Sequence, residues 1–253
     1  MRIVVKIGSN VLTRADGNPD VSRMSLLVDQ MAAIKDAGHE LIVVTSGAVA
    51  CGRAVLHHED ELDKVEQRQL FSAVGQANLV SRYSSFFAAH GYNVGQVLIM
   101  KENFLREEEY ANLKRCMRVM LEYGVIPVVN ENDTVSVTEL MFTDNDELSG
   151  RLAKMISADL LIILSNMDGL YTGNPADPAS RLVPEVRVGQ DVSSYISASK
   201  SSAGRGGMES KCATALSLAE AGIKVIIANG KRDNVLTLLL NEPSKLPHTV
   251  FYK

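Results

Sequence analysis

The chain has 253 residues, of which 46% are hydrophobic and 22% are charged, an ordinary composition for a globular protein with a full hydrophobic core. Its formal net charge of −4 at pH 7 argues against nucleic acid as the main partner, because nucleic-acid-binding proteins carry basic surfaces. No apolar run reaches the ~18 residues of a membrane-spanning helix, so no membrane contact is expected. Cys51, Cys116 and Cys212 lack metal-ligand or redox spacing, which fits a reducing cytoplasm.

Short runs rich in β-branched residues are typical of buried strands. In chain order they are Ile3–Ile7, Leu41–Thr45, Val94–Met100, Val125–Asn130, Leu160–Leu164 and Lys224–Ala228. Segments with helical periodicity alternate with them, and Gly75 is a candidate break in the second. They are Val21–Ala37, Lys64–Ala89, Arg106–Tyr123, Glu147–Ser157 and Met208–Ala221. This alternation predicts an α/β protein whose mostly parallel sheet is covered on both faces.

Two segments depart from this pattern. Thr134–Phe142 alternates polar and apolar residues, which predicts a hairpin or an edge strand. Gly173–Arg187 contains three prolines and is either a surface connection or a wall of a nucleotide pocket. No linker is rich enough in Pro, Gly or Ser to split the chain, so we expect a single domain over residues 1–253.

Ligands of such sheets bind beyond the carboxyl ends of the strands, so the strand ends are the places to look for chemistry. The first predicted strand carries Lys6, followed by Gly8 and Ser9. A buried lysine costs several kcal/mol unless an anion meets it. Either this is an edge strand with Lys6 in water, or Lys6 is aimed at phosphate and Gly8 lets the backbone approach.

The second predicted strand ends in the small residues Thr45-Ser46-Gly47-Ala48, where a helix is expected to begin. Backbone N–H groups at such a place can face an anion, aided by the helix dipole. Simple helix capping by Ser46 is the alternative. The pattern is not G-x-S-x-G, so a hydrolase nucleophile is disfavoured.

Polar residues gather after the fourth predicted strand. They are Asn130, Glu131, Asn132 and Asp133, with Asp144, Asn145 and Asp146 before the next helix. Helix capping by Asp144 or Asn145 is one interpretation. The other is a pocket for an amino acid, in which Asp133 meets the ammonium and Asn145 binds the carboxylate or the amine. A calcium loop is rejected, because the later ligands of an EF-hand are missing.

Ser165 and Asn166 follow the fifth predicted strand, and "GRGGMESK" (204–211) leads into the last predicted helix and includes its first turn. The glycines can cover phosphates with backbone N–H groups, while Lys211 falls in the first helical turn. The segment is not the standard P-loop, because Lys211 does not directly follow a glycine and no Ser or Thr comes after it. The alternative is a flexible loop with Lys211 exposed.

Together, and in this order, these motifs are specific for one protein family. The sequence resembles the amino acid kinase family, and within it the glutamate 5-kinases, through "VVKIGSNVLT", "VTSGAVACG", "QLFSAVGQ", "VVNENDTV", "DNDELSG", "GLYTGNP" and "GRGGMESK". The resemblance covers nearly the whole chain. It implies a three-layer αβα sandwich whose mostly parallel sheet has about eight strands. It also implies transfer of the γ-phosphoryl group of ATP to the γ-carboxylate of L-glutamate, the first step of proline synthesis. Residues 1–150 would bind glutamate and residues 151–253 ATP.

The resemblance also implies roles for single residues. Lys6 and Lys211 would contact the transferring phosphoryl, and Asp146 would orient the two lysines. Glutamate would be bound by Ser46, Asp133 and Asn145. ATP would be bound by Lys6, Ser165, Asn166, Arg205, Gly206, Gly207, Met208, Glu209, Ser210 and Lys211. These roles suit the chemistry, because phosphoryl transfer needs positioning and charge neutralisation, and a carboxylate acceptor is already ionised at neutral pH.

ATP would be the co-substrate, with Mg²⁺ bound mainly through its phosphates and by no assigned protein ligand. Proline as feedback inhibitor, a homo-oligomer, and hand-over of the product to glutamyl phosphate reductase are expected from the same resemblance. Ser165-Asn166 stands where the family commonly has Thr-Asp, Thr143 where it has Gly, and Arg205 where it has Thr, so the resemblance does not fix the exact nucleotide contacts. The chain stops at "HTVFYK", before the small PUA-type domain of many relatives, so no RNA role is expected.

Two other classes of function stay open. One is another amino acid kinase, acting on acetylglutamate, aspartate, carbamate or UMP, although the acidic, amide-rich acceptor segment favours an acceptor with an ammonium. The other is a non-catalytic sensor of ATP or an amino acid on the same fold. Lys6, Lys211 and Asp146 together disfavour the sensor, which needs no positive charge around a migrating phosphoryl.

Overall fold

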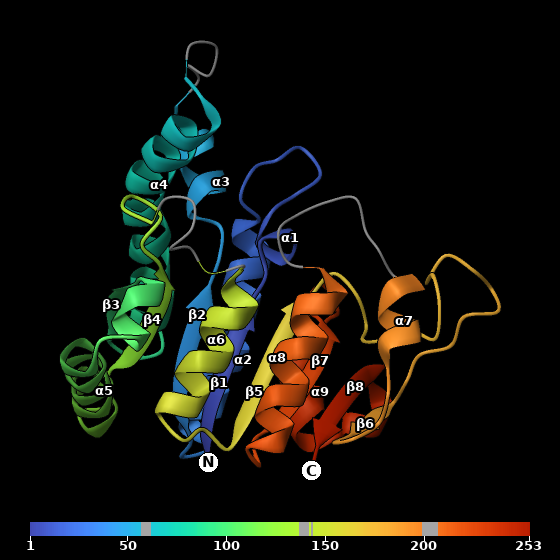
Figure 1. Cartoon of the computed structure of the whole chain (residues 1–253). Coiled ribbons are helices and arrows are strands. Elements are labelled where there is room, and N and C mark those ends of the chain that lie inside the picture. The colour runs from blue at the N-terminus through green and yellow to red at the C-terminus, as the bar shows by residue number, and fades with distance from the viewer. Residues whose placement is uncertain (57–61, 137–141, 143, 199–206) are drawn as a thin grey trace.

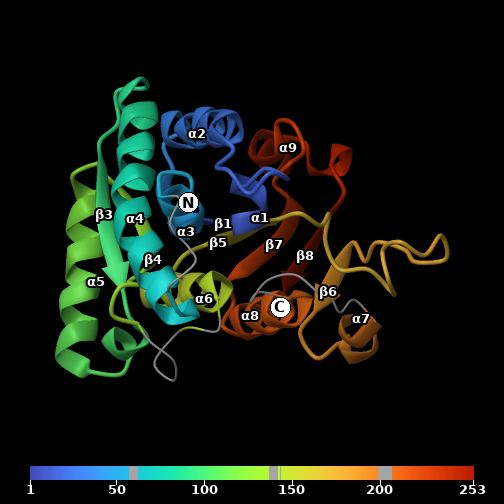
Figure 2. The ribbon, with the colours of Figure 1, turned by 90° about the horizontal axis from the view of Figure 1, so that it is seen from above.

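The computed structural model describes residues 1–56, 62–136, 142, 144–198 and 207–253. Two layers of helices enclose a central sheet, as Figures 1 and 2 show. The sheet has eight strands in the order β3-β4-β2-β1-β5-β7-β8-β6. They span Arg2–Ile7 (β1), Glu40–Thr45 (β2), Val94–Ile99 (β3), Ile126–Glu131 (β4), Leu160–Ser165 (β5), Glu185–Arg187 (β6), Lys224–Asn229 (β7) and His248–Tyr252 (β8). Neighbouring strands are parallel except β7 and β8, which confirms the predicted αβα architecture.

The helices divide between the two faces of the sheet: α2, α4 and α9 pack on one face and α5, α6 and α8 on the other. Their bounds are Ser9–Leu12 (α1), Val21–Asp36 (α2), Ala48–Arg53 (α3), Lys64–Ala88 (α4), Glu107–Glu122 (α5), Asn145–Met155 (α6), Ser193–Ala198 (α7), Met208–Glu220 (α8) and Val235–Asn241 (α9). Short 3₁₀ helices cover Lys101–Phe104 (η1) and Pro243–Lys245 (η3). No described helix is long and apolar enough to cross a membrane.

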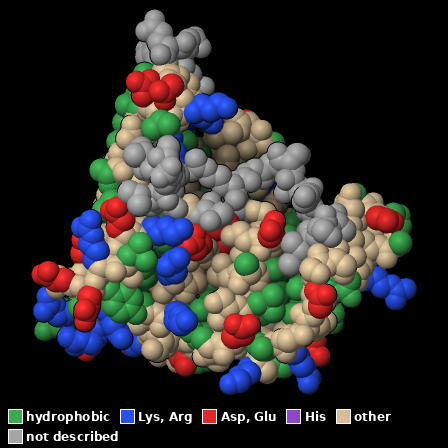
Figure 3. Space-filling model, in the orientation of Figure 1, with side chains coloured by type: hydrophobic (Ala, Val, Ile, Leu, Met, Phe, Trp, Pro, Cys, Tyr) green, Lys and Arg blue, Asp and Glu red, His purple; other side chains and the backbone are tan. Residues whose placement is uncertain are grey.

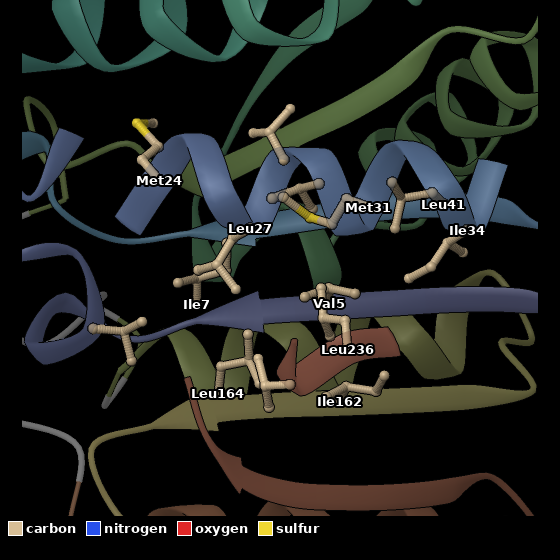
Figure 4. Packing of buried hydrophobic residues seen from close by; sticks show 14 of the residues in the cluster. Val5, Ile7, Met24, Leu27, Met31, Ile34, Leu41, Ile162, Leu164 and Leu236 are labelled. Atoms are coloured by element: carbon tan, nitrogen blue, oxygen red, sulfur yellow. The ribbon is translucent and has the colours of Figure 1, made fainter. Parts of the chain in front are cut away.

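Alternate residues of the central strands feed two separate cores. Val5 and Ile7 of β1 face α2, whose Leu27 and Met31 pack against them (Figure 4). Val4 faces the other way, into the core beneath α6 and α8. Each such side chain contributes about 1.5–3 kcal/mol when fully buried. Because successive side chains of a strand alternate, Lys6 lies on the same face of β1 as Val4, the face covered by α6 and α8.

The six predicted strands and five predicted helices match elements of the structure to within two residues, and these predictions are confirmed. A helix was also expected to begin at Thr45–Ala48, where α3 starts, whereas the short elements α1, α7, α9, β6 and β8 were not predicted. Each spans seven residues or fewer, too few to show a clear period.

The break expected at Gly75 is wrong, because α4 runs unbroken through it. A Cβ at Gly75 would lie 1.8 Å from the carbonyl oxygen of Ala48, and one at Gly52 would lie 1.9 Å from that of Phe71. These glycines therefore let α3 and α4 cross in close contact.

The hairpin or edge strand predicted over Thr134–Phe142 is wrong in its first part, since Thr134 and Val135 lie in a turn. Backbone N–H groups of Val135 and Ser136 donate to the carbonyl of Asn132. Residues 137–141 lie outside the described part of the chain. The proline-containing segment Gly173–Arg187 ends in β6, and no residue of it is among those that line the cleft described below.

Candidate active site

A cleft of about 750 Å³ lies beyond the carboxyl ends of the central strands. Those strand ends approach each other because β4, β2, β1 and β5 are adjacent and parallel. Predicted site residues that line the cleft are Lys6, Ser46, Asp133, Asn145, Ser165, Asn166 and Lys211. Acidic and basic side chains are interspersed on the face of the molecule shown in Figure 3.

Lys6 lies near the end of β1, which pairs with β2 on one side and β5 on the other. The edge-strand interpretation is therefore wrong, and Lys6 is only 4% exposed. A charge buried to this degree needs a partner. Its Nζ lies 2.6 Å from Oδ1 of Asp146.

Asp146 joins Lys6 to Lys211. It lies in the first turn of α6 and is completely buried, and its Oδ2 accepts a hydrogen bond of 2.9 Å from Nζ of Lys211. Lys211 lies in the first turn of α8 and is 8% exposed, so the interpretation as an exposed lysine is wrong. Burial raises the pKa of the Asp146 carboxyl, but Lys6 and Lys211 outweigh it and hold that pKa below its usual value.

Asp144 places Asp146 at the start of α6. Its Oδ1 accepts hydrogen bonds from the backbone N–H groups of Asp146 and Glu147, at 2.9 and 3.0 Å, so Asp144 caps the helix. Burial, and next to it the charge of Asp146, raise the pKa of the Asp144 carboxyl.

We name Lys6, Asp146 and Lys211 the lysine cluster; it carries one positive charge in excess, and both of its lysines line the cleft.

A second charged group in the cleft centres on Arg68 of α4. Its Nη2 lies 3.1 Å from Oε2 of Glu131 and also donates to Oδ1 of Asp133. The other oxygen of Glu131 accepts from the backbone N–H of Phe142 at 3.0 Å. We name Arg68, Glu131 and Asp133 the carboxylate cluster; it carries one negative charge in excess. Arg68 was not predicted from the sequence, and Glu131 had no predicted role, although a charged residue near the start of a long helix was the available signal.

Ser46 and Asn145 meet through their side chains. Nδ2 of Asn145 lies 2.8 Å from Oγ of Ser46 and 3.0 Å from the carbonyl oxygen of Thr45. Helix capping by Ser46 is wrong, because the N-cap residue of α3 is Gly47, whose φ of 105° is in the left-handed region that favours glycine. Ser46 is thus available to the cleft.

The predicted nucleotide residues are only partly brought together. Ser165 ends β5 and hydrogen-bonds to the backbone of Met167, and Asn166 follows it into the cleft. Gly207 precedes α8, and Met208, Glu209 and Ser210 form its first turn with Lys211. Of these five, Lys211 lines the cleft. Arg205 and Gly206, like Thr143, lie outside the described residues.

Within the described ranges, no group of three or more His, Cys, Asp or Glu side chains is arranged to hold a metal ion. The carboxylates of the cleft are instead engaged with basic side chains and backbone N–H groups.

A model of the amino acid kinase family matches residues 1–229. A glutamate 5-kinase of Bacteroides thetaiotaomicron is 60% identical over 250 residues, which cover 99% of this chain and 69% of that protein. The glutamate 5-kinase of Chlorobaculum tepidum is 44% identical, with 93% and 65% covered. Glutamate 5-kinase 2 of Bacillus subtilis is 39% identical, with 96% and 66% covered. The chain thus spans about two thirds of the length of these relatives.

Solved structures share the fold. Carbamate kinase from Giardia lamblia, bound to AMP-PNP, superposes with a TM-score of 0.69 at 18% identity, covering 100% of this chain and 98% of that one. UMP kinase from Ureaplasma parvum superposes with a TM-score of 0.67 at 16% identity, also covering 100% and 98%. At these identities the likeness shows the αβα architecture alone.

Proposed function

The chain belongs to the amino acid kinase family, and within it to the glutamate 5-kinases, and on this premise we propose that it phosphorylates the γ-carboxylate of L-glutamate with ATP. The products would be L-glutamyl 5-phosphate and ADP. The observation that carries the proposal is that one cleft holds two clusters with opposite excess charge. L-Glutamate brings an α-ammonium, which suits the carboxylate cluster, and a γ-carboxylate that accepts the phosphoryl group beside the lysine cluster.

In the proposed reaction, an oxygen of the γ-carboxylate bonds to the γ-phosphorus of ATP, and the bond from that phosphorus to the bridging oxygen of ADP breaks. No general base is needed, because the carboxylate is ionised at neutral pH. Lys6 and Lys211 would contact the migrating phosphoryl, where their excess positive charge favours the transition state. Asp146 would hold the two ammonium groups in place, and its lowered pKa keeps it ionised.

The acceptor would be recognised by the carboxylate cluster and the amide beside it. Asp133 would bind the α-ammonium of glutamate, with Ser46 and Asn145 as further contacts. The two carboxylates of the cluster support this role, since carboxylate oxygens accept strong, charge-assisted hydrogen bonds from an ammonium.

The nucleotide would lie against the other side of the cleft. Ser165, Asn166 and residues 205–211 would contact ATP, so that residues 1–150 serve the acceptor and residues 151–253 the nucleotide. Mg²⁺ would arrive on the phosphates of ATP and neutralise part of their charge. This placement is supported by Ser165, Asn166 and Lys211, which line the cleft from β5 and α8.

The proposal extends to the setting of the reaction. The step would be the first of proline synthesis, in the cytoplasm, with proline as feedback inhibitor and a homo-oligomer as the working form. The product is a reactive mixed anhydride, which supports direct hand-over to glutamyl phosphate reductase.

The test is ADP release with ATP, Mg²⁺ and each candidate acceptor, with hydroxylamine present to trap an acyl phosphate as a hydroxamate. We expect turnover and a hydroxamate with L-glutamate, and neither with acetylglutamate, aspartate, carbamate or UMP. Turnover with one of those acceptors instead would replace the substrate and keep the fold and the mechanism. ATP binding without turnover on any acceptor would favour a sensor.

A further inference from the structure

The segment "QLFSAVGQ" (69–76) supplies no residue to the reaction described above. Its last residue, Gln76, lies on α4, is 8% exposed and does not line the cleft. Its Oε1 nevertheless accepts a hydrogen bond of 2.9 Å from Nδ2 of Asn130, near the end of β4, which is 2% exposed. A polar side chain buried to this degree is costly unless it is hydrogen-bonded, so the contact has an energetic consequence.

Asn130 links Gln76 to the cleft. Its Oδ1 accepts from the backbone N–H of Glu131 and from Nδ2 of Asn145, both at 2.9 Å. A backbone N–H can only donate, so the side-chain oxygen of Asn130 must face it. The side-chain nitrogen of Asn130 then faces Gln76, whose oxygen is the atom that can accept.

The orientation of Asn145 follows from the same reasoning. Its Nδ2 also lies 3.0 Å from the carbonyl oxygen of Thr45, and a carbonyl can only accept. The nitrogen of Asn145 is therefore held inward and its oxygen is left for the cleft, which Asn145 lines. Within the described part of the chain, this oxygen accepts no hydrogen bond. The sequence left open whether Asn145 binds a carboxylate or an amine, and an amide oxygen can accept only from the amine.

We infer that Gln76 is a positioning residue of the acceptor pocket. By accepting from Asn130, it holds the amide of Asn145 with the oxygen turned toward the α-ammonium of glutamate. Without the oxygen of Gln76, Nδ2 of Asn130 would be buried with no acceptor, and Asn130 would turn to find one. That turn would remove one of the three acceptors around Nδ2 of Asn145 and hold its amide less firmly. The inference rests on the proposed function, because it assigns the amide to the acceptor of that reaction.

The test replaces Gln76 by methionine, which has a similar length and no accepting oxygen. We expect Gln76→Met to raise the KM for L-glutamate by about tenfold to a hundredfold. The KM for ATP should stay within about threefold, because the nucleotide does not depend on this amide. Gln30→Met is the matched control. Gln30 on α2 is also 8% exposed and also accepts one buried hydrogen bond, from the N–H of Leu236 at 2.9 Å, but Leu236, unlike Asn130, does not line the cleft.

The control variant should lower the unfolding temperature and leave the KM for glutamate unchanged. A second readout is inhibition by glutarate, which lacks the α-ammonium. Its inhibition constant should be the same for Gln76→Met and the unmodified protein. A general distortion of the pocket would instead weaken the binding of both glutarate and glutamate. Gln76→Glu retains an accepting oxygen and should keep the KM for glutamate. It carries the test even where Gln76→Met is not recovered folded.

Three results would overturn the inference alone: an unchanged KM for glutamate in Gln76→Met, an equal loss of glutarate and glutamate binding, or the full loss of glutamate affinity in Gln76→Glu. Absence of glutamate turnover by the unmodified protein would overturn the proposed function and this inference with it. The two failures are thus distinguishable.

Discussion

The two charged clusters of the cleft have opposite compositions. In the lysine cluster, Lys6 and Lys211 share one carboxylate, that of Asp146. In the carboxylate cluster, Glu131 and Asp133 share one guanidinium, that of Arg68. Partial compensation lets the protein bury several charges and still keep a residual charge of a defined sign, to which a ligand can respond.

The clusters also differ in how firmly they are built. Lys6 comes from a central strand, and Asp146 and Lys211 come from the first turns of two helices. Arg68 instead reaches from α4 with a side chain that is 20% exposed, and Asp133 lies in the turn after β4. We therefore expect the lysine cluster to control the rate of phosphoryl transfer and the carboxylate cluster to control the affinity for glutamate.

The largest effect is expected for Lys211→Met. Removing one of two charges that stabilise the migrating phosphoryl should lower kcat by about a hundredfold to a thousandfold or more. The KM for glutamate should change little, and the circular dichroism spectrum should persist. Lys224→Met, at an exposed lysine that begins β7, is the control and should retain full activity. Unchanged turnover in Lys211→Met would remove the lysine cluster from the mechanism.

Asp133→Asn should act mainly on binding. Loss of a charge-assisted hydrogen bond to the ammonium should raise the KM for glutamate by about tenfold to a hundredfold, as steady-state kinetics would measure. The fall in kcat should be smaller. Asp233→Asn removes a carboxylate that is 87% exposed and pairs loosely with Arg23, so it should change neither constant. A fall in kcat with an unchanged KM would assign Asp133 to the chemical step.

Arg68→Met should have a weaker effect on the same constant. It leaves the carboxylates of Glu131 and Asp133 without their shared cation, so they should separate and hold the ammonium less well. We expect the KM for glutamate to rise by about tenfold or less. Arg118→Met, which breaks the exposed pair with Glu122 on α5, should leave the KM unchanged. A lower KM in Arg68→Met would show that Arg68 competes with the substrate for Asp133.

The smallest effect concerns Asp144, the carboxyl beside the lysine cluster. Its pKa is raised in the folded state, chiefly by burial, so folding favours its protonated form. The contribution of the Asp144 carboxyl to the free energy of unfolding is then greatest below its unfolded pKa of about 4. That contribution falls as the pH rises toward the pKa of the folded state. Asparagine at position 144 caps α6 about as well as aspartate and does not titrate. The free energies of unfolding of Asp144→Asn and of the unmodified protein should therefore differ by about 1 kcal/mol or less. Urea unfolding across this range measures the difference, and parallel pH profiles would contradict it. Asp63→Asn, at the exposed cap of α4, controls for the cap itself.

Long periodic elements could be predicted from the sequence, because each carries enough buried positions to show its period. A lysine inside an apolar strand could likewise be recognised, since burial of Lys6 demands an anion. The sequence could not supply partners that lie far apart along the chain. Arg68 meets Asp133 across 65 positions, and Gln76 meets Asn130 across 54. Such pairs depend on the order of the strands and on where α4 crosses the sheet, which local patterns do not encode.

The cap at Ser46 illustrates a second limit. A serine before a helix is an ordinary capping signal, but the N-cap residue of α3 is Gly47, with a positive φ. Because Gly47 takes the N-cap position, the side chain of Ser46 does not cap the helix and instead hydrogen-bonds with Asn145.

The most direct test of the division between the two clusters is calorimetric titration of L-glutamate into the unmodified protein, Lys211→Met and Asp133→Asn. We predict that Lys211→Met binds glutamate with unchanged affinity while being nearly inactive, and that Asp133→Asn loses most of its binding. Loss of glutamate binding in Lys211→Met, with binding retained in Asp133→Asn, would contradict the account.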